Sequence, residues 1–467
     1  MNTLTLILAI GALVVLVWAG IVLARGSLVG TALAVLLVGS CFGHSFLHVD
    51  VGSLPLAADH LLLVVLVAQY AIYRRWGQIE PRPPLATDYV LGAFLVVLVV
   101  STLVHDYRAD HFQPLAFLAC FYLMPAVIYW MVRQSEWTAQ TAWWVFAALA
   151  AFGVYLCATV AAETYGAWDF VFPKYIASPA FAEFYGRGRG PFLNPAATGL
   201  VQTLGMCAAL AFWPRASRPG KLLLLALLGV FLCGIYSTLS RSVWLGAGGA
   251  LLLMLALSTP RAWRFRVVAT TVAGAAIAVG VSWQQYRAFE GDKGISAKAA
   301  AESTALRPIL QVAWQMFLDR PILGCGLGQY SRELPAYLAQ QTAQLPLGKS
   351  RAYAQDNVFL SLLTETGVLG TSLFVALLAC WTLTAWRLRR AATAPVWARQ
   401  MGLVFLTFMT AYLTIGMVCD LSKVPMVNMF LFFLGGAIMG TAVWLADPQA
   451  ASLKLWRPRE EPELVAN

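Results

Sequence analysis

Apolar runs separated by short polar loops extend along almost the whole chain. Each run is long enough for a helix to cross a hydrocarbon core of about 30 Å. None shows the alternation of apolar and polar positions that a barrel strand requires. The pattern therefore predicts an all-α, polytopic membrane protein with about 12–13 transmembrane helices. The runs lie near residues 3–24, 28–43, 57–73, 88–104, 114–132, 140–162, 195–213, 221–239, 243–258, 266–283, 357–386, 400–419 and 425–446.

Basic residues gather in every second loop of this pattern. Cytoplasmic loops carry an excess of Lys and Arg, so these loops predict which segments face the cytoplasm. The first run lacks a basic leading region and a clean cleavage site, and we expect it to be retained as a helix. The basic loop residues are Arg74, Arg75 and Arg82; Arg215, Arg218 and Lys221; Arg261, Arg264 and Arg266; and Arg387, Arg389, Arg390 and Arg399, followed by Lys454, Arg457 and Arg459 near the end.

Two long segments fall on the opposite, outer side. The first is rich in aromatic residues, Gly and Pro. The second contains two stretches of helical spacing, 301–317 and 331–345, and predicts a helical periplasmic loop domain, since long structured loops are usually functional. The predicted parts are N-terminal transmembrane helices (1–162), a first external segment (163–194), central transmembrane helices (195–283), a large periplasmic loop (284–356), C-terminal transmembrane helices (357–446) and a cytoplasmic tail (447–467).

Composition agrees with the membrane prediction and limits the classes of partner. Hydrophobic residues make up 60% of the chain and charged residues 12%, about half the charged share of a soluble domain. The net charge of +10 follows the loop pattern, so it indicates orientation and no nucleic-acid partner. The eight Cys form no CxxC or Cys/His cluster, and we expect neither a disulfide nor a metal site.

Two arginine motifs stand on the predicted outer side. In Gly186-Arg187-Gly188-Arg189-Gly190-Pro191, glycines allow close backbone approach and the guanidinium groups suit phosphate oxygens. An exposed turn is the alternative interpretation. Arg241, between Ser240 and Ser242, stands at the outer junction of two predicted helices, where the positive-inside rule disfavours Arg. An anionic ligand would explain it, as would pairing with a structural carboxylate.

The large loop supplies a third group. Arg307, Arg320 and Arg332 lie around a GxGxG sequence at 324–328. No strand or βαβ unit accompanies these glycines, so they predict a tight turn that presents backbone N–H groups, and no dinucleotide site.

The loop closes on a polar stripe. Asn357, Ser361, Thr364 and Glu365 share one helix face, which predicts that they point toward protein or a watery cavity. Asp356 stands at the start of this helix as an N-cap, as a general base or sugar anchor, or as both.

Four motifs in order resemble the O-antigen ligase and polymerase superfamily, whose members move glycans from polyprenyl pyrophosphate. They are RGRGPFLNPAATGL, YSTLSRSVWLG, RPILQVAWQMFLDRPILGCGLGQYSRELPAY and DNVFLSLLTETGVLG. Together they cover residues 185–375. The resemblance implies a multi-pass enzyme of the bacterial inner membrane with a periplasmic active site. It implies a polyprenyl-pyrophosphate-linked glycan donor, a glycan or lipid A-core acceptor, contact with membrane lipid, and no cofactor.

The chain departs from the family at one position. Asp356 stands where ligases place a histidine, and all five His residues lie at or before His111. Either Asp356 substitutes for that imidazole or the reaction depends on arginine-held pyrophosphate as leaving group. The resemblance thus implies catalysis by Asp356 and Arg241, pyrophosphate binding by Arg187, Arg189 and Arg241, and glycan contacts from Arg307, Arg320, Tyr330, Asn357 and Glu365. We expect inversion at the anomeric carbon without a metal ion.

Several functions remain open at this stage. Ligases and polymerases share these motifs, so the sequence does not separate them. A transporter or flippase for lipid-linked glycans is a second hypothesis, but the chain shows no internal repeat of the transporter kind. A protein O-oligosaccharyltransferase of the same superfamily is a third hypothesis. It is disfavoured because the segment after Asp447 is short and basic.

Overall fold

The computed structural model describes residues 26–43, 48–51, 54–105, 114–178, 184, 186–281, 311–341 and 357–446. Among these residues, eight helical segments are long and apolar enough to cross a membrane, so the all-α, multi-pass prediction is confirmed. They are α4 (Ala86–Val104), the continuous α5 (Pro114–Leu118), η1 (Ala119–Leu123) and α6 (Met124–Gln134), α7 (Ala139–Thr164), α8 (Pro195–Leu210), α9 (Arg218–Ser237), α10 (Arg241–Ser258), α15 (Val358–Arg390) and α17 (Pro425–Ala446).

Four further helices occupy predicted apolar runs but are shorter or more polar than these eight. They are α2 (Leu28–Phe42), α3 (Ala58–Arg75), α11 (Arg261–Val281) and α16 (Val396–Gly416). The run at 3–24 lies outside the described residues, so the number of spans stays a prediction. The antiparallel hairpin of β1 (His48–Val51) and β2 (Leu54–Ala57) was not predicted, because its strands fall between two apolar runs.

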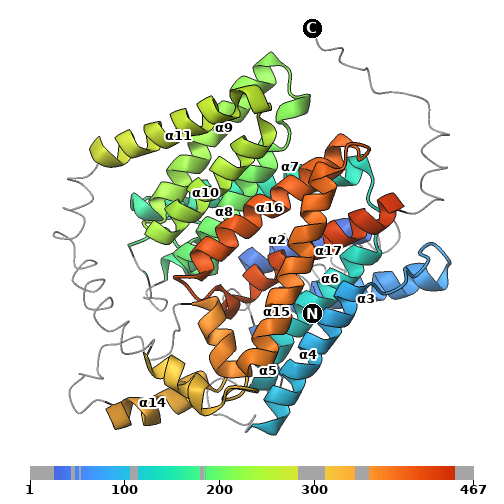
Figure 1. Cartoon of the computed structure of the whole chain (residues 1–467), viewed down its shortest axis with the longest axis vertical. Helices are drawn as coiled ribbons and strands as arrows, with labels where there is room; N and C mark the ends of the chain where they lie inside the picture. Colours follow the sequence, from blue (N-terminus) through green and yellow to red (C-terminus); the bar gives the residue numbers. More distant parts are fainter. Residues whose placement is uncertain are drawn as a thin grey trace, which may run out of the picture.

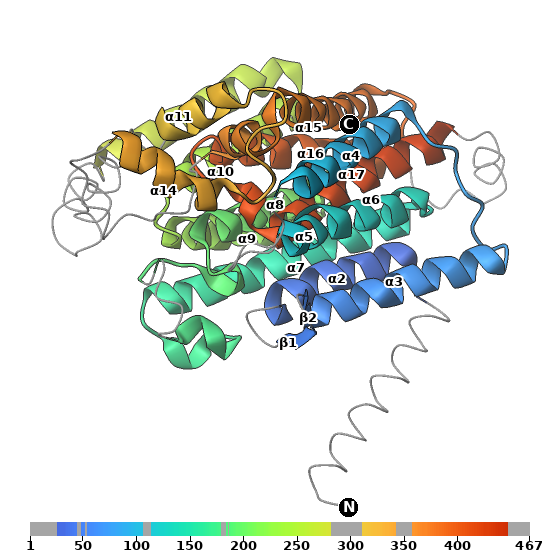
Figure 2. The same cartoon turned by 90° about the horizontal axis from the view of Figure 1, so that it is seen from below.

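Helices α8 and α17 form the centre of the bundle, and most of their side chains are buried. Helix α16 packs between α10 and α15, while α17 packs on α6. Figure 1 shows α3 at one side of the bundle, and Figure 2 shows α2 lying beside it. A bundle of apolar helices satisfies its backbone polar groups internally, as a span in lipid must.

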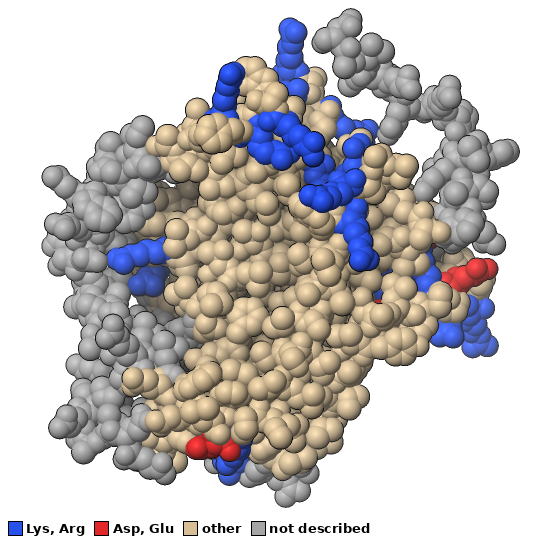
Figure 3. Space-filling model, viewed as in Figure 1, with Lys and Arg blue, Asp and Glu red and all other residues tan. Residues whose placement is uncertain are grey.

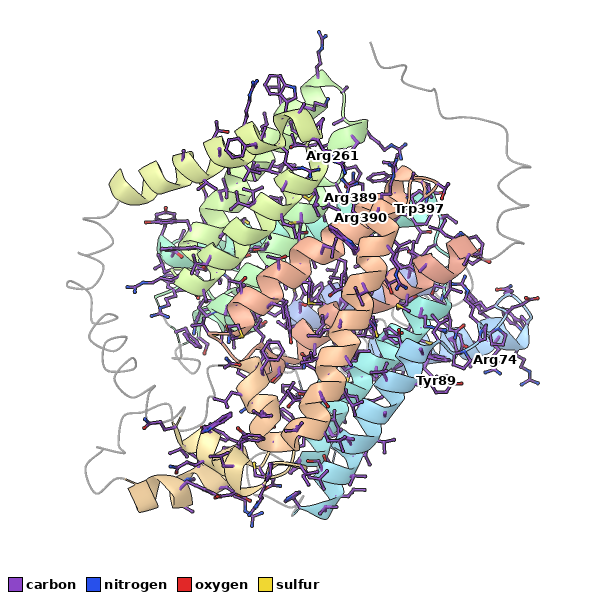
Figure 4. All side chains as sticks on the ribbon, in the orientation of Figure 1. Arg74, Tyr89, Arg261, Arg389, Arg390 and Trp397 are labelled. Atoms are coloured by element: carbon purple, nitrogen blue, oxygen red, sulfur yellow. The ribbon has the colours of Figure 1, made fainter. Side chains whose placement is uncertain are left out.

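One end of the bundle is rich in arginine. Figure 3 shows the Lys and Arg side chains gathering toward one end of this face. Figure 4 places Arg389 and Arg390 near Arg261 there, and Arg389 donates to the carbonyl of Leu257 at the end of α10. This is the end that the basic loops predict to face the cytoplasm.

The opposite end carries the outer segments. Short 3-10 turns η2 (Trp168–Phe170) and η3 (Lys174–Ala177) fold back on η4 (Gly190–Phe192), where the Tyr175 hydroxyl donates to the Pro191 carbonyl at 2.8 Å. In the large loop, a helix at 311–319 and α14 (Tyr330–Gln341) pack together. Further 3-10 turns are η5 (Trp213–Arg215) and η6 (Leu421–Lys423).

Candidate functional site

The two arginines of the 186–190 loop have different environments. Arg189 is fully buried, and its Nε donates to Glu163 Oε1 at 2.8 Å. The backbone N–H groups of Arg189 and Gly190 donate to Glu163 Oε2 at 2.7 and 3.0 Å, and Arg189 Nη2 donates to the Ile176 carbonyl at 2.6 Å. This pairing corrects the prediction that Arg189 binds pyrophosphate, because its guanidinium fork is directed at protein acceptors.

Glycine lets the same loop lie flat on the bundle. A Cβ at Gly188 would lie 2.1 Å from Val160 Cγ1, so no other residue fits. The Gly188 N–H donates to the carbonyl of Ser237 at 3.1 Å, and the Thr164 hydroxyl donates to the same carbonyl at 2.9 Å. The loop is therefore fixed to the last residue of α9. A simple exposed turn does not fit Arg189, because this side chain is fully buried. Arg187 is half-buried.

Arg241 follows directly from this attachment point. After Ser237 the chain turns sharply through Leu239, whose φ is 51°, and α10 begins at Arg241 with Ser240 as its N-cap residue. Residues 240–242 were predicted to stand at a junction of two helices, and they lie at the junction of α9 and the first turn of α10. Arg241 is exposed. Because the loop is bonded to Ser237, Arg187 and Arg241 are brought to the same end of the bundle.

The start of α15 lies at this end too. A Cβ at Gly246 of α10 would lie 2.8 Å from Ile415 of α16, so the first turns of α10 lie beside the end of α16. The Asn357 side chain donates to the Met417 carbonyl, next to that end, at 3.1 Å. Asn357 Oδ1 accepts from the N–H groups of Phe359 and Leu360 at 2.8 and 3.1 Å. The N-cap of α15 is thus Asn357, whereas the sequence suggested Asp356 for this role. Asp356 and Arg307 both lie outside the described residues.

Helix α15 is interrupted near its start. Gly367 has φ 67° and ψ −167°, which is non-helical, and the parts before and after it run in different directions (Figure 1). The glycine-rich turn fills the interruption: Cys325 N–H donates to the Thr364 carbonyl at 2.9 Å and Gly326 N–H to the Glu365 carbonyl at 3.0 Å. Gly324, Gly326 and Gly328 have positive φ, as a tight turn requires. The tight turn is present as predicted. Its N–H groups donate their hydrogen bonds to carbonyl groups of α15.

Glu365 joins the turn to a second charged segment. Its carboxylate is buried and accepts from the Gly328 N–H at 3.1 Å. Lys423 Nζ lies 3.8 Å from Glu365 Oε1 and 3.7 Å from Asp420 Oδ2. Burial raises the pKa of the Asp420 carboxyl, and the charge of Lys423 opposes this shift. Ser361, Thr364 and Glu365 are all buried, so the polar stripe points inward as its spacing predicted.

The described part of the large loop holds two further predicted residues. Tyr330 is buried, and Lys423 Nζ lies 5.3 Å from the centre of its ring. Arg320 Nη1 donates to Glu333 Oε1 at 2.7 Å, and this hydrogen bond raises the pKa of Arg320. Both residues therefore hold the loop together, and Arg320 is also partly open to solvent.

Three residues at this end, His105, Asp420 and Lys423, were not predicted from the sequence. His105 follows α4 directly, and its ring lies against Gly326, where a Cβ would be 2.6 Å from the ring Cγ. Asp420 and Lys423 lie between two apolar runs and look like ordinary loop residues. A possible signal was that both are charged within a short outer loop. Within the described ranges, no group of three or more His, Cys, Asp or Glu side chains could hold a metal ion.

The bundle is that of a multi-pass membrane protein. Its candidate site lies at the end that the basic loops predict to be outer. Residues 222–375 match the family model described as O-antigen ligase, and this segment includes Arg241, the glycine-rich turn, Asn357 and Glu365. Over that segment the chain is similar to the O-antigen ligase family. No curated protein matches the chain.

Proposed function

We propose that this protein transfers a glycan from a polyprenyl-pyrophosphate carrier to a glycan or glycolipid acceptor on the periplasmic side of the inner membrane. The observation that carries the proposal is the attachment of the 186–190 loop to Ser237 by the Gly188 N–H, at 3.1 Å. That bond holds the residue next to Arg187 against the turn that leads to Arg241. This turn, unlike Arg187, lies inside the segment that matches the O-antigen ligase model.

Pyrophosphate is the chemical group that this arrangement suits. Guanidinium groups bind phosphate oxygens through paired N–H donors and keep their charge at any relevant pH. Arg189 is neutralised by Glu163, so in the proposal Arg187 and Arg241 contact the donor while Arg189 positions the loop. Stabilising charge on a departing pyrophosphate lowers the barrier to breaking the sugar–phosphate bond.

The proposed reaction is a direct displacement. An acceptor hydroxyl oxygen forms a bond to the anomeric carbon, the bond from that carbon to the pyrophosphate oxygen breaks, and the configuration inverts. The bonding electrons leave with the polyprenyl pyrophosphate, and the hydroxyl proton passes to a base. Asp356 is the proposed base, since it directly precedes Asn357, which is fixed to Met417. Whether the acceptor is a lipid A-core or a growing polysaccharide separates ligase from polymerase.

The transporter hypothesis gains one observation from the structure. Glu365, Asp420 and Lys423 form a charged group with both carboxylates buried. The group lies beside an interrupted helix, and such helices occur in transporters. Here the group binds the glycine-rich turn, which favours a role in positioning the loop. A transporter would move the lipid-linked glycan without forming a new glycosidic bond, so product formation by purified protein separates the two functions.

Replacing Arg241 with Ala tests the proposal. With purified protein, lipid-linked glycan and acceptor, we expect Arg241→Ala to lower transfer about 100-fold or more, because it removes a donor to the developing charge. Arg261→Ala is the matched control, since Arg261 is also exposed and also begins a helix, α11, at the opposite end. Full transfer by Arg241→Ala at equal protein abundance would refute the assignment.

A further inference from the structure

A small polar pocket lies beside the glycine-rich turn, apart from the 186–190 loop. Its volume is about 270 Å³, and His105, Gln329, Arg332 and Glu333 line it. All four side chains are polar, in a chain that is 60% hydrophobic. His105 comes from the end of α4, and the others come from the first turn of α14 and the residue before it.

The imidazole in this pocket has a defined orientation. His105 Nδ1 lies 2.9 Å from the carbonyl oxygen of Ser101. A carbonyl accepts only, so Nδ1 carries a proton and donates it, and in the neutral ring Nε2 is the acceptor. The ring also rests on Gly326, whose φ is +105°. The backbone of both segments therefore fixes the ring.

The opposite wall has hydrogen bonds of its own. Gln329 is buried, and its N–H donates to the Gly326 carbonyl at 3.1 Å. Glu333 accepts from Arg320 at 2.7 Å. The Ser101 hydroxyl accepts from the Leu327 N–H at 3.2 Å, which ties the turn to α4. A pocket with walls fixed in this way binds a ligand at a lower entropic cost.

The four side chains suit a ligand that is rich in hydroxyl groups. Glu333 and His105 Nε2 accept hydrogen bonds, Arg332 donates, and Gln329 does both. A hydroxyl both donates and accepts, so a sugar ring matches this mixture. A phosphate does not, because it would face the Glu333 carboxylate.

We propose that this pocket binds an uncharged sugar residue of the glycan substrate, with His105 Nε2 accepting a hydrogen bond from a sugar hydroxyl. The identity of the ligand as part of a glycan substrate rests on the proposed function. The pocket itself is a separate subsite from the arginines that would hold pyrophosphate.

Saturation-transfer NMR on the full chain in lipid nanodiscs tests this proposal. The probes are glucose, galactose, rhamnose and N-acetylglucosamine, with inorganic phosphate as the contrasting probe. We expect a saturable signal from at least one sugar that phosphate does not displace. His105→Gln and Arg332→Ala should each weaken it about tenfold, the scale of one lost hydrogen bond.

Matched controls separate binding from general damage. His60→Gln changes a histidine that contacts Asp59 elsewhere in the bundle, and Arg261→Ala changes an exposed arginine at the opposite end. Both should leave the signal unchanged. The proposal is overturned if no sugar gives a saturable signal, if phosphate displaces the sugar, or if Arg332→Ala, a change at an exposed position, binds as wild type does. None of these results would contradict glycan transfer that depends on Arg241. The experiment therefore tests the sugar pocket separately from the proposed function.

Discussion

At the residue scale, two arginine–glutamate pairs of nearly equal length differ in burial. Arg189 and Glu163 are 2.8 Å apart with both side chains fully buried, whereas Arg320 and Glu333 are 2.7 Å apart with 45% and 25% of their side chains exposed. A buried charge that loses its partner is costly, while an exposed pair contributes little. The sequence pattern could not separate Arg187 from Arg189, because the partner, Glu163, is distant in the chain and ends an apolar helix.

Removing the Glu163 charge should therefore destabilise the protein. We expect Glu163→Gln to cost about 3–5 kcal/mol, because Arg189 would remain buried without a compensating charge. Glu333→Gln is the matched control and should cost less than about 1 kcal/mol. Thermal unfolding of the purified variants in one detergent measures both. Equal unfolding temperatures for the two variants would contradict the structural role given to Arg189.

Contacts across long sequence separations explain what residue patterns missed. His105 looks like the polar end of an apolar run, and its place beside Gly326 depends on how α4 packs against α15. Likewise, the N-cap of α15 is Asn357, whereas the sequence suggested the neighbouring Asp356. Both residue types are good N-caps, so propensity alone did not distinguish them.

At the element scale, apolar runs predicted the helices well because each span must bury a continuous apolar surface in lipid or protein. The predicted run at 243–258 corresponds to α10, which begins two residues earlier, at Arg241. The interruption of α15 was not predicted, because Gly367 lies in an apolar run that reads as a continuous span. Its positive φ matters only once the carbonyl of Ile322 occupies the space that a side chain would need.

Gly367→Ala should disturb the large loop without preventing membrane insertion. The new Cβ would lie 2.2 Å from the Ile322 carbonyl oxygen at a φ of +67°, and such backbone strain costs about 1–3 kcal/mol. We expect faster proteolysis within 311–341 and lower glycan transfer. Gly92→Ala in α4 is the control, because a Cβ there meets nothing within 4 Å. Equal proteolysis of both variants would show that the interruption does not position the loop.

At the scale of the whole molecule, the chemistry is concentrated at one end of the bundle. Arg187, Arg241, Asn357 and the Glu365–Lys423 contact come from separate segments that meet where α16 ends. The sequence predicted that these segments share a side, through the alternation of basic loops. It could not predict which of them touch, since that follows from how α10, α15 and α16 pack.

The orientation of the two ends can be tested with a matched pair of residues. Phe170 lies in the first external segment and Phe265 in the arginine-rich start of α11, with 83% and 82% exposure. In a Cys233→Ser background, which removes an exposed native thiol, a membrane-impermeant maleimide should label Phe170→Cys in intact cells. Phe265→Cys should be labelled only after lysis, because the excess of Arg holds that end in the cytoplasm. The reverse pattern would place Arg241 on the cytoplasmic side, out of reach of a periplasmic acceptor, and would exclude the proposed reaction whatever the geometry of the site.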